Sequence, residues 1–437
     1  MFAPNPPTFP APVHLDGTTL EGGGQLLRLA LSLSSLTQQP IYVTDIRGKR
    51  PGKVSGLKAS HLAAVKWLAN ATAATTEGME VKSRELVFRP SKTGEETRSN
   101  SDQAEHVARK GDEKEGVWEN VFEDDRLVRR QSHITMSSPG SILLVMQAIL
   151  PYLLFSNSSN MEAQKRVVPL RVTIEGGTNV SSSPSIEYVS QVLLPMLSQK
   201  MSINPITTTL HKRGWSTGRT EIGSVTFDIE PLPRAFVLST FSFKNRGQLA
   251  KVHVSILAPE AAARTSIRDK VIAQLLAYSP EIEILFPVDE KSGNEKRLYL
   301  LLVAETSNGY RLGRDWLFDE KTRGLSAEEV GAKLVSKVMK DLKNELKHGG
   351  CVDEYMQDQL VVFQALAAGK AEVDGGIDKE ATLHTKTARW VAEQVVGTGF
   401  DELGGCQGLE YAVGEEFRKR RKNYLGNAIT AMKQLST

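Results

Sequence analysis

A run of glycines near the N-terminus is the first segment whose residues could bind a phosphate group. Glu21 precedes three consecutive glycines, and the apolar residues over 25–36 are typical of a buried helix that follows them. Glycines let backbone N–H groups approach an anion closely, and a helix N-terminus carries partial positive charge. Glu21 could hold a divalent metal ion bound to that phosphate. The run matches neither the Walker A pattern nor the dinucleotide fingerprint, so a glycine-rich turn with a capping glutamate is the alternative.

A basic loop over 47–53 carries four cations in seven residues, Arg47 and Arg50 among them. Guanidinium groups suit bidentate binding of phosphate, so the loop could contact a phosphorylated ligand. A solvated loop is the alternative. His61 lies on the apolar stripe of a helix predicted over 57–68, where the spacing also fits an ordinary packed histidine.

Two further candidates lie in the last quarter of the chain. A helix that begins near Asp353 would place Tyr355, Asp358 and Gln359 on one face, where a ring, a carboxylate and an amide could stack on and hydrogen-bond a purine. A polar helix surface would give the same spacing. His384 stands in a hydroxyl-rich segment at a predicted strand-to-helix junction, and its spacing alone does not mark a catalytic role.

Composition excludes several classes of protein. The chain has 437 residues, of which 40% are hydrophobic and 24% charged, as in a globular protein of two to three domains rather than a collagen, a coiled coil or a disordered chain. The net charge of +3 does not by itself indicate a nucleic-acid-binding protein. The eight histidines and two cysteines form no zinc motif, and no nucleophile-elbow motif occurs.

Targeting signals are sparse. The first residues lack the basic and apolar parts of a signal peptide, and the longest apolar stretch, over 142–155, is shorter than the ~20 residues that span a bilayer. Two cysteines favour a reducing compartment. We therefore expect an intracellular protein, nuclear or cytoplasmic and not secreted. A basic pentamer over 418–422 could be a nuclear-import or nucleic-acid patch, or an exposed helix face.

The elements that must position these residues are of mixed type and predict an α+β fold. Nineteen charges in forty positions over 91–130 indicate a mobile insertion, because such a segment buries too little surface to offset the entropy of ordering. Prolines over 231–233 mark a boundary, after which a compact α+β unit begins. The patterns predict strands over 13–18, 41–46, 85–88, 168–174, 207–212, 224–229, 236–243, 251–257, 282–286 and 298–304, and further helices over 141–155, 186–197, 259–277 and 326–347.

In combination, the motifs resemble those of the RNA 3′-terminal phosphate cyclases. The residues that carry the resemblance are LEGGGQLLR over 20–28 and EGGTN over 175–179, with matching segments over 15–17, 46–47, 56–62, 348–360 and 383–388. The chain looks like a true cyclase of eukaryotic type with an extra charged insertion. The resemblance implies a large domain of three repeated units, each a four-stranded sheet with two helices, and a smaller inserted α+β domain. The boundaries expected are a flexible tail over 1–12, the large domain over 13–232 and 346–437, and the inserted domain over 233–345.

The resemblance also implies a substrate, a cofactor set and a mechanism. A histidine attacks the α-phosphorus of ATP and forms a covalent bond to AMP, the AMP passes to an RNA 3′-phosphate, and the vicinal 2′-hydroxyl then closes a 2′,3′-cyclic end. A divalent metal ion, Mg²⁺ or Mn²⁺, and arginines would neutralise the phosphate charge. By matching motif, the nucleophile is His384, the metal-proximal acid is Glu21, the ATP contacts are Gln147, Pro184, Tyr355, Asp358 and Gln359, and the polar groups near the phosphates or the RNA end are Arg28, Arg47, Arg50 and His61.

Two alternatives remain open at this point. One is a catalytically inactive cyclase-like factor in pre-rRNA processing and ribosome biogenesis, which lacks the nucleophile, and the other is a non-catalytic RNA-binding scaffold. The sequence departs from the cyclase pattern at Ser60, where the family has glutamine, and over 213–219, where a glycine-rich stretch is shortened. The presence of both the glycine run and His384 favours the enzyme.

Overall fold

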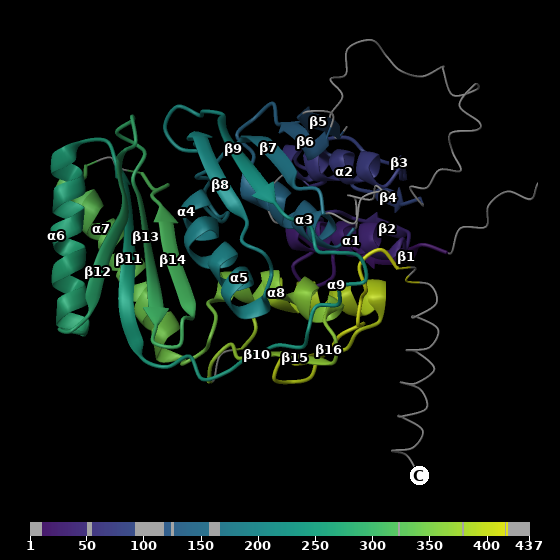
Figure 1. The fold of residues 1–437 in the computed structure, drawn as a ribbon. Helices are drawn as coiled ribbons and strands as arrows, with labels where there is room; N and C mark the ends of the chain where they lie inside the picture. The colour runs from purple at the N-terminus through teal and green to yellow at the C-terminus, as the bar shows by residue number, and fades with distance from the viewer. Residues whose placement is uncertain are drawn as a thin grey trace, which may run out of the picture.

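In the larger part of the molecule helices lie between sheets, whereas at one side a helix forms the outer layer over a sheet (Figure 1). The computed structural model describes residues 11–49, 55–91, 118–123, 126–156, 167–321, 324–377, 380–415 and 417. Helix α1 packs against α3 and α9, and α9 packs against α8. The central helices are α1 (Gly24–Thr37), α2 (Ala59–Ala71), α3 (Ile142–Phe155), α8 (Glu354–Leu366) and α9 (Leu383–Val396).

Three sheets surround these helices. The first has the order β1-β2-β4-β3 and the second β5-β6-β7-β9-β8, whereas the third, in the described part of the chain, has the order β10-β15-β16. Beside the second sheet, a helical segment runs through α4 (Ile186–Tyr188), a π-helical stretch (Val189–Leu193) and α5 (Leu194–Met201). The strands are β1 (Val13–Asp16), β2 (Ile41–Thr44), β3 (Thr75–Glu77), β4 (Leu86–Arg89), β5 (Glu119–Glu123), β6 (Arg126–Thr135), β7 (Leu170–Gly176), β8 (Thr207–Lys212), β9 (Gly223–Ile229), β10 (Ser242–Phe243), β15 (Lys370–Val373) and β16 (Cys406–Gln407).

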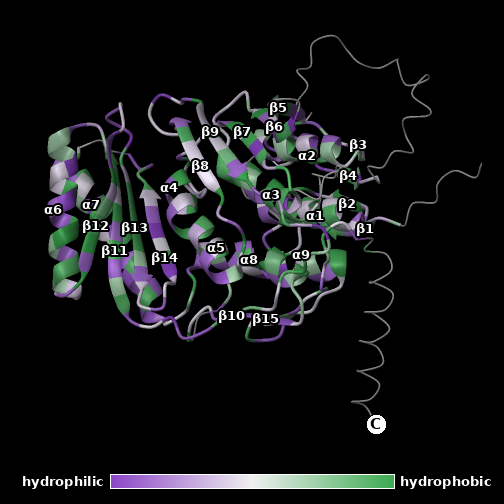
Figure 2. Cartoon of the chain, in the orientation of Figure 1, coloured by the Kyte–Doolittle hydropathy of each residue, from purple (hydrophilic) through white to green (hydrophobic). Residues whose placement is uncertain are grey.

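A fourth sheet, with the order β12-β11-β13-β14, carries helices α6 (Ala261–Tyr278) and α7 (Ala327–Lys347). Alternate residues of β13 serve two cores: Leu300 and Leu302 face α6 and α7, while Leu301 faces the main core. Helix α6 shows hydrophobic and hydrophilic residues in alternation along its length (Figure 2), as expected where one helix face covers a sheet. The strands are β11 (Leu249–Ala258), β12 (Glu283–Lys291), β13 (Tyr299–Thr306) and β14 (Arg311–Leu317).

The α+β class is confirmed, but the strands differ from expectation in number. The first sheet has the four strands expected, the second has five, and the third has three among the described residues. Six of the observed strands were not predicted: β3, β5, β6, β14, β15 and β16. The strand predicted over 236–243 is reduced to Ser242–Phe243, because the preceding residues make isolated backbone hydrogen bonds to the C-terminal segment, such as Ala235 N–H to the Val413 carbonyl.

The prediction of a mobile insertion over 91–130 is wrong for its last part. Residues 119–123 and 126–130 pair as β5 and β6. Leu127 is buried, and the Trp118 ring lies edge-on to Trp67 with the centroids 5.6 Å apart. A few apolar side chains therefore anchor this hairpin. Its many charged side chains give the segment the composition of a mobile loop, so the composition did not reveal the two strands. Residues 92–117 lie outside the described residues.

No helix among the described residues has the length and apolar character needed to cross a membrane.

A buried carboxylate fixes the start of α8. Asp353 caps this helix: its Oδ1 accepts hydrogen bonds from the backbone N–H groups of Tyr355 (3.0 Å) and Met356 (2.8 Å) and from the Tyr188 hydroxyl (2.7 Å). Its Oδ2 accepts from the Gly313 N–H of β14 at 2.7 Å. Asp353 thus joins α8, α4 and β14.

We expect Asp353→Ala to lower the free energy of unfolding by roughly 3–5 kcal/mol, because it leaves several buried donors without an acceptor. The measurement is urea unfolding. Ser326→Ala is the matched control: Ser326 caps α7 on the surface, where loss of a cap costs about 1 kcal/mol. If the two variants lost the same free energy of unfolding, Asp353 would contribute no more to stability than an ordinary helix cap.

Candidate active site

A cavity of about 540 Å³ opens where α1, α3, α8 and α9 meet the fourth sheet. Its wall includes the side chains of seven residues that the sequence singled out, and polar or aromatic side chains of the fourth sheet. The seven are Arg28, Gln147, Pro184, Tyr355, Asp358, Gln359 and His384. Residues from five separate parts of the sequence therefore come together in one site.

A histidine–carboxylate pair lies at one end of this cavity. His384 is the second residue of α9, which begins at the Thr382 cap. Its Nδ1 lies 3.2 Å from Oε2 of Glu21, and the backbone N–H of Glu21 donates to the Thr387 hydroxyl at 3.2 Å. The His384 side chain is 51% exposed, whereas that of Glu21 is 9% exposed. The ion pair therefore leaves Nε2 as the ring nitrogen not directed at Glu21.

Glu21 raises the pKa of His384 above its ordinary value of 6.5. The hydrogen bond that the ring donates to Glu21 is the largest cause, and the charges of Glu21 and Asp358 act in the same direction, while burial and Arg28 oppose them. A carboxylate that binds Nδ1–H also fixes the neutral tautomer in which Nε2 holds the lone pair. The geometry suits a histidine that acts as a nucleophile through Nε2.

The glycine run makes room for these side chains. A Cβ on Gly23 would lie 2.3 Å from a Glu21 carboxylate oxygen, and a Cβ on Gly24 would lie 2.6 Å from Nη1 of Arg28 and 2.7 Å from Nε2 of His61. Any other residue would force these side chains to move. The run therefore permits close approach of functional side chains, in addition to any contact with an anion.

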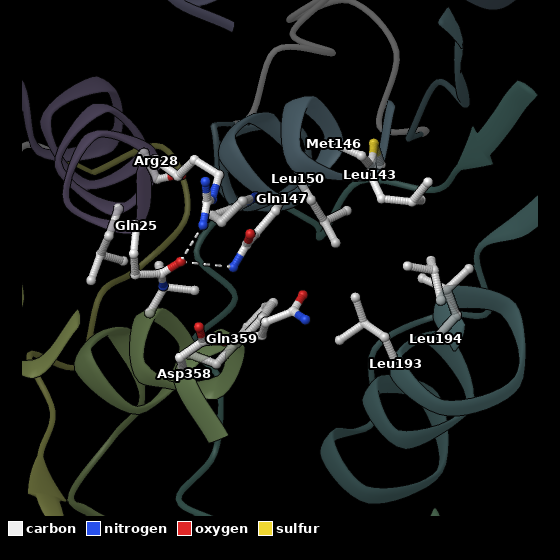
Figure 3. A pocket seen from close by; sticks show the side chains of 16 residues that line it. Gln25, Arg28, Leu143, Met146, Gln147, Leu150, Leu193, Leu194, Asp358 and Gln359 are labelled. Carbon is white, nitrogen blue, oxygen red and sulfur yellow. Dashed lines mark hydrogen bonds between the residues drawn. The ribbon is translucent and has the colours of Figure 1, made fainter. Parts of the chain in front are cut away.

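Arg28 and two amides form a polar row in a smaller pocket, which shares Arg28, Gln147, Asp358 and Gln359 with the cavity (Figure 3). Oε1 of Gln25 accepts hydrogen bonds from Nη2 of Arg28 at 2.7 Å and from Nε2 of Gln147 at 3.4 Å. Asp358 and Gln359 of α8 lie across the pocket from this row (Figure 3). Burial raises the pKa of Asp358 to about 7, although Arg28 and His384 favour its charged form.

The other end of the cavity lies against β14. The Arg314 guanidinium stacks over the Tyr355 ring, 4.7 Å from its centroid, and pairs with Glu345 at 2.8 Å and Glu354 at 2.6 Å. Tyr188 packs edge-on to Tyr355 at 5.8 Å. These contacts hold the Tyr355 ring in one orientation at the cavity wall.

Three sequence-predicted residues do not line the cavity. Nδ1 of His61 accepts from the Lys58 N–H at 3.2 Å, and its ring lies beside Gly24. Arg47 is only 3% exposed and donates its backbone N–H to the Gly22 carbonyl at 3.0 Å, so a solvated loop does not describe this residue. Glu21 acts through its contact with His384. Arg50 lies outside the described residues.

A divalent metal ion was expected at Glu21. The described residues contain no group of three or more histidines, cysteines or acids arranged to hold a metal ion. Glu21 supplies one carboxylate, which fits Mg²⁺ only where substrate phosphates and water provide the remaining ligands.

Two groups of site residues were not predicted from the sequence. Gln25 follows the glycine run directly, and its position at a helix start was the only available signal. The others come from the fourth sheet and α7, among them Asp315, Trp316 and Lys337. Their sequence neighbourhood is typical of an exposed surface, so spacing gave no signal.

Comparisons with known proteins identify the family of this chain. A family model described as RNA 3′-terminal phosphate cyclase matches residues 19–401. A protein of Nitrosospira multiformis named RNA 3′-terminal phosphate cyclase is 30% identical over 393 residues, which cover 89% of this chain and 92% of the relative. Proteins with the same name from Pyrococcus furiosus and Desulfurococcus amylolyticus are each 30% identical, covering 90% and 86% of this chain and 96% and 90% of the relatives. The chain belongs to the RNA 3′-terminal phosphate cyclase family.

The histidine–glutamate pair generates a prediction that is independent of any substrate. Glu21→Gln should lower the pKa of His384, because the largest contribution that raises it is lost. The measurement is an NMR titration of the His384 ring. Below its raised pKa the wild-type ring is protonated, so in the variant the neutral form should persist to lower pH.

Glu380→Gln is the control for this titration, since Glu380 pairs with Lys386 on the surface at the same end of α9. It should leave the His384 titration in place. An unchanged His384 pKa in Glu21→Gln would show that the pair does not exist in solution.

Proposed function

We propose that this protein converts an RNA 3′-terminal phosphate to a 2′,3′-cyclic phosphodiester in an ATP-dependent reaction with a covalent histidine–AMP intermediate. Family membership supports cyclase activity on RNA. The observation that carries the mechanism is the pairing of His384 Nδ1 with Glu21 at the end of the cavity that also contains Arg28. That pairing prepares Nε2 for attack on an electrophilic phosphorus.

The first step forms a phosphorus–nitrogen bond. Nε2 of neutral His384 attacks the α-phosphorus of ATP, and the bond from that phosphorus to the bridging oxygen breaks with loss of pyrophosphate. The Nδ1 proton stays on the ring, and Glu21 stabilises the positive charge that the ring gains. A guanidinium such as that of Arg28 offsets charge on the phosphates.

The next two steps transfer and release AMP. An oxygen of the RNA 3′-phosphate attacks the phosphorus of histidine–AMP, the phosphorus–nitrogen bond breaks, and the ring returns to its neutral form. The 2′-hydroxyl then attacks the RNA phosphorus and gives its proton to water, and AMP leaves as the cyclic end forms. Each step leaves the charges and atoms balanced without a redox partner.

The remaining residues have assigned parts in this proposal. Tyr355, Asp358, Gln359, Gln147 and Pro184 would bind ATP, since all five line the cavity. Arg28, Arg47, Arg50 and His61 would act near the phosphates or the RNA end. A divalent ion, held by Glu21 together with phosphate oxygens and water, would neutralise phosphate charge. A nuclear or cytoplasmic location stays a prediction, and the basic pentamer over 418–422 lies outside the described residues.

We expect His384→Ala to abolish the acid-labile enzyme–AMP that forms with labelled ATP. The variant should retain its fold, because the side chain is half-exposed. It should still cyclise an RNA that is already adenylylated at its 3′-phosphate, since the histidine serves only the first two steps. The measurement is a paired assay of enzyme labelling and of cyclic-end formation on this RNA.

His211→Ala is the matched control, because His211 lies on β8 and bonds the Thr226 hydroxyl at 2.8 Å, away from the cavity. It should label like the wild type. Labelling of His384→Ala to the wild-type extent would exclude His384 as the nucleophile. A wild-type protein that never labels would instead favour the inactive cyclase-like factor or the RNA-binding scaffold.

A further inference from the structure

Asp315 of β14 lies in the cavity wall at a distance from the catalytic pair. Its Oδ2 accepts a hydrogen bond from the Tyr299 hydroxyl at 2.9 Å, and that hydroxyl lies 2.5 Å from the hydroxyl of Ser185. Ser185 follows Pro184 directly and caps α4. Asp315 is thus held by the hydroxyl groups of Tyr299 and Ser185, and a carboxylate with two such bonds keeps acceptor capacity for a ligand.

The hydroxyl groups that hold Asp315 are connected to the Tyr355 ring through Tyr188. The Tyr188 N–H donates to the Ser185 hydroxyl at 3.0 Å, and the Tyr188 ring packs edge-on to Tyr355 with the centroids 5.8 Å apart. Burial first, and then the charge of Asp315, raise the pKa of Tyr355. Pro184, Asp315 and Tyr355 therefore bound one end of the cavity together.

The two ends of the cavity differ in their charged groups. Asp358 interacts with Arg28 and His384, which belong to the end proposed for the phosphates. Asp315 instead interacts with Glu187 and Arg314, and Arg314 is committed to Glu345 and Glu354. A carboxylate at this end repels phosphate and attracts a neutral group that donates a hydrogen bond.

We propose that Asp315 selects the nucleobase of the triphosphate, by accepting a hydrogen bond from an amino group at position 6 of a purine stacked on Tyr355. A purine with a carbonyl at this position presents an acceptor to the carboxylate and is rejected. The inference rests on the proposed function, and it makes the fourth sheet the source of base specificity. Asp315 is a specificity-determining residue, separate from the residues that react.

The test compares three triphosphates in the enzyme-labelling assay: ATP, the purine riboside triphosphate that lacks the amino group, and inosine triphosphate. The wild type should use ATP about tenfold or more better than either analogue, the range expected for a hydrogen bond to a charged group. Asp315→Asn should reduce the preference for ATP over inosine triphosphate by about tenfold, because an amide can donate to the carbonyl.

Asp289→Asn is the matched control, since Asp289 lies on β12 of the same sheet, paired with Arg264 at 2.8 Å. It should keep the wild-type preference. Equal use of the three nucleotides by the wild type would overturn the proposal, even if Asp315→Asn failed to fold. A uniform loss with all three nucleotides in Asp315→Asn would also overturn it and would place the ribose at Asp315. Absence of labelling by any nucleotide would refute the proposed function itself.

Discussion

The cavity depends on one buried carboxylate that accepts four hydrogen bonds from three elements. Asp353 binds the first turn of α8, the Tyr188 hydroxyl and the Gly313 N–H of β14. Burial raises its pKa, while Arg314 and the Gly313 N–H act against that rise. A carboxylate at such a depth is stable only when its acceptor sites are filled. The bonds that satisfy Asp353 therefore also set where α8 presents Tyr355 and Asp358.

Close approach at the glycine run is the second constraint. Gly22 has a φ of 56°, and a Cβ there would lie 1.8 Å from the Gly17 carbonyl oxygen. This sharp turn of the backbone brings Glu21 into contact with His384 of α9, although the two residues are 363 positions apart in the sequence. Because side chains are excluded at Gly23 and Gly24, Glu21, Arg28 and His61 can occupy one small region.

Motif and periodicity predicted most elements, because their apolar residues repeat at helical or strand spacing. The start of α8 at Asp353 and the cap of α7 at Ser326 were both predicted and are confirmed. Strand β14 is one of several strands that the patterns did not predict, and here Arg311, Arg314 and Asp315 break the apolar alternation that marks a strand. Each of these charges has a partner on another element, Arg311 with Glu305 and Arg314 with Glu345, for example. Tertiary pairing of this kind has no signature in a single sequence, so the part of the cavity wall that β14 provides could not be foreseen.

The position of β14 explains why polar residues gather there. It is the last strand of its sheet, and an uncovered edge strand exposes unpaired backbone groups. Here Asp353 accepts the Gly313 N–H, and the ring of Tyr188 lies so close that a Cβ on Gly313 would be 2.9 Å from it. Covering the edge thus requires polar side chains at the boundary between two hydrophobic cores. Polar groups at such a boundary pack against both cores and also reach the cavity. The contacts that cover the sheet edge therefore also position the groups that face a ligand.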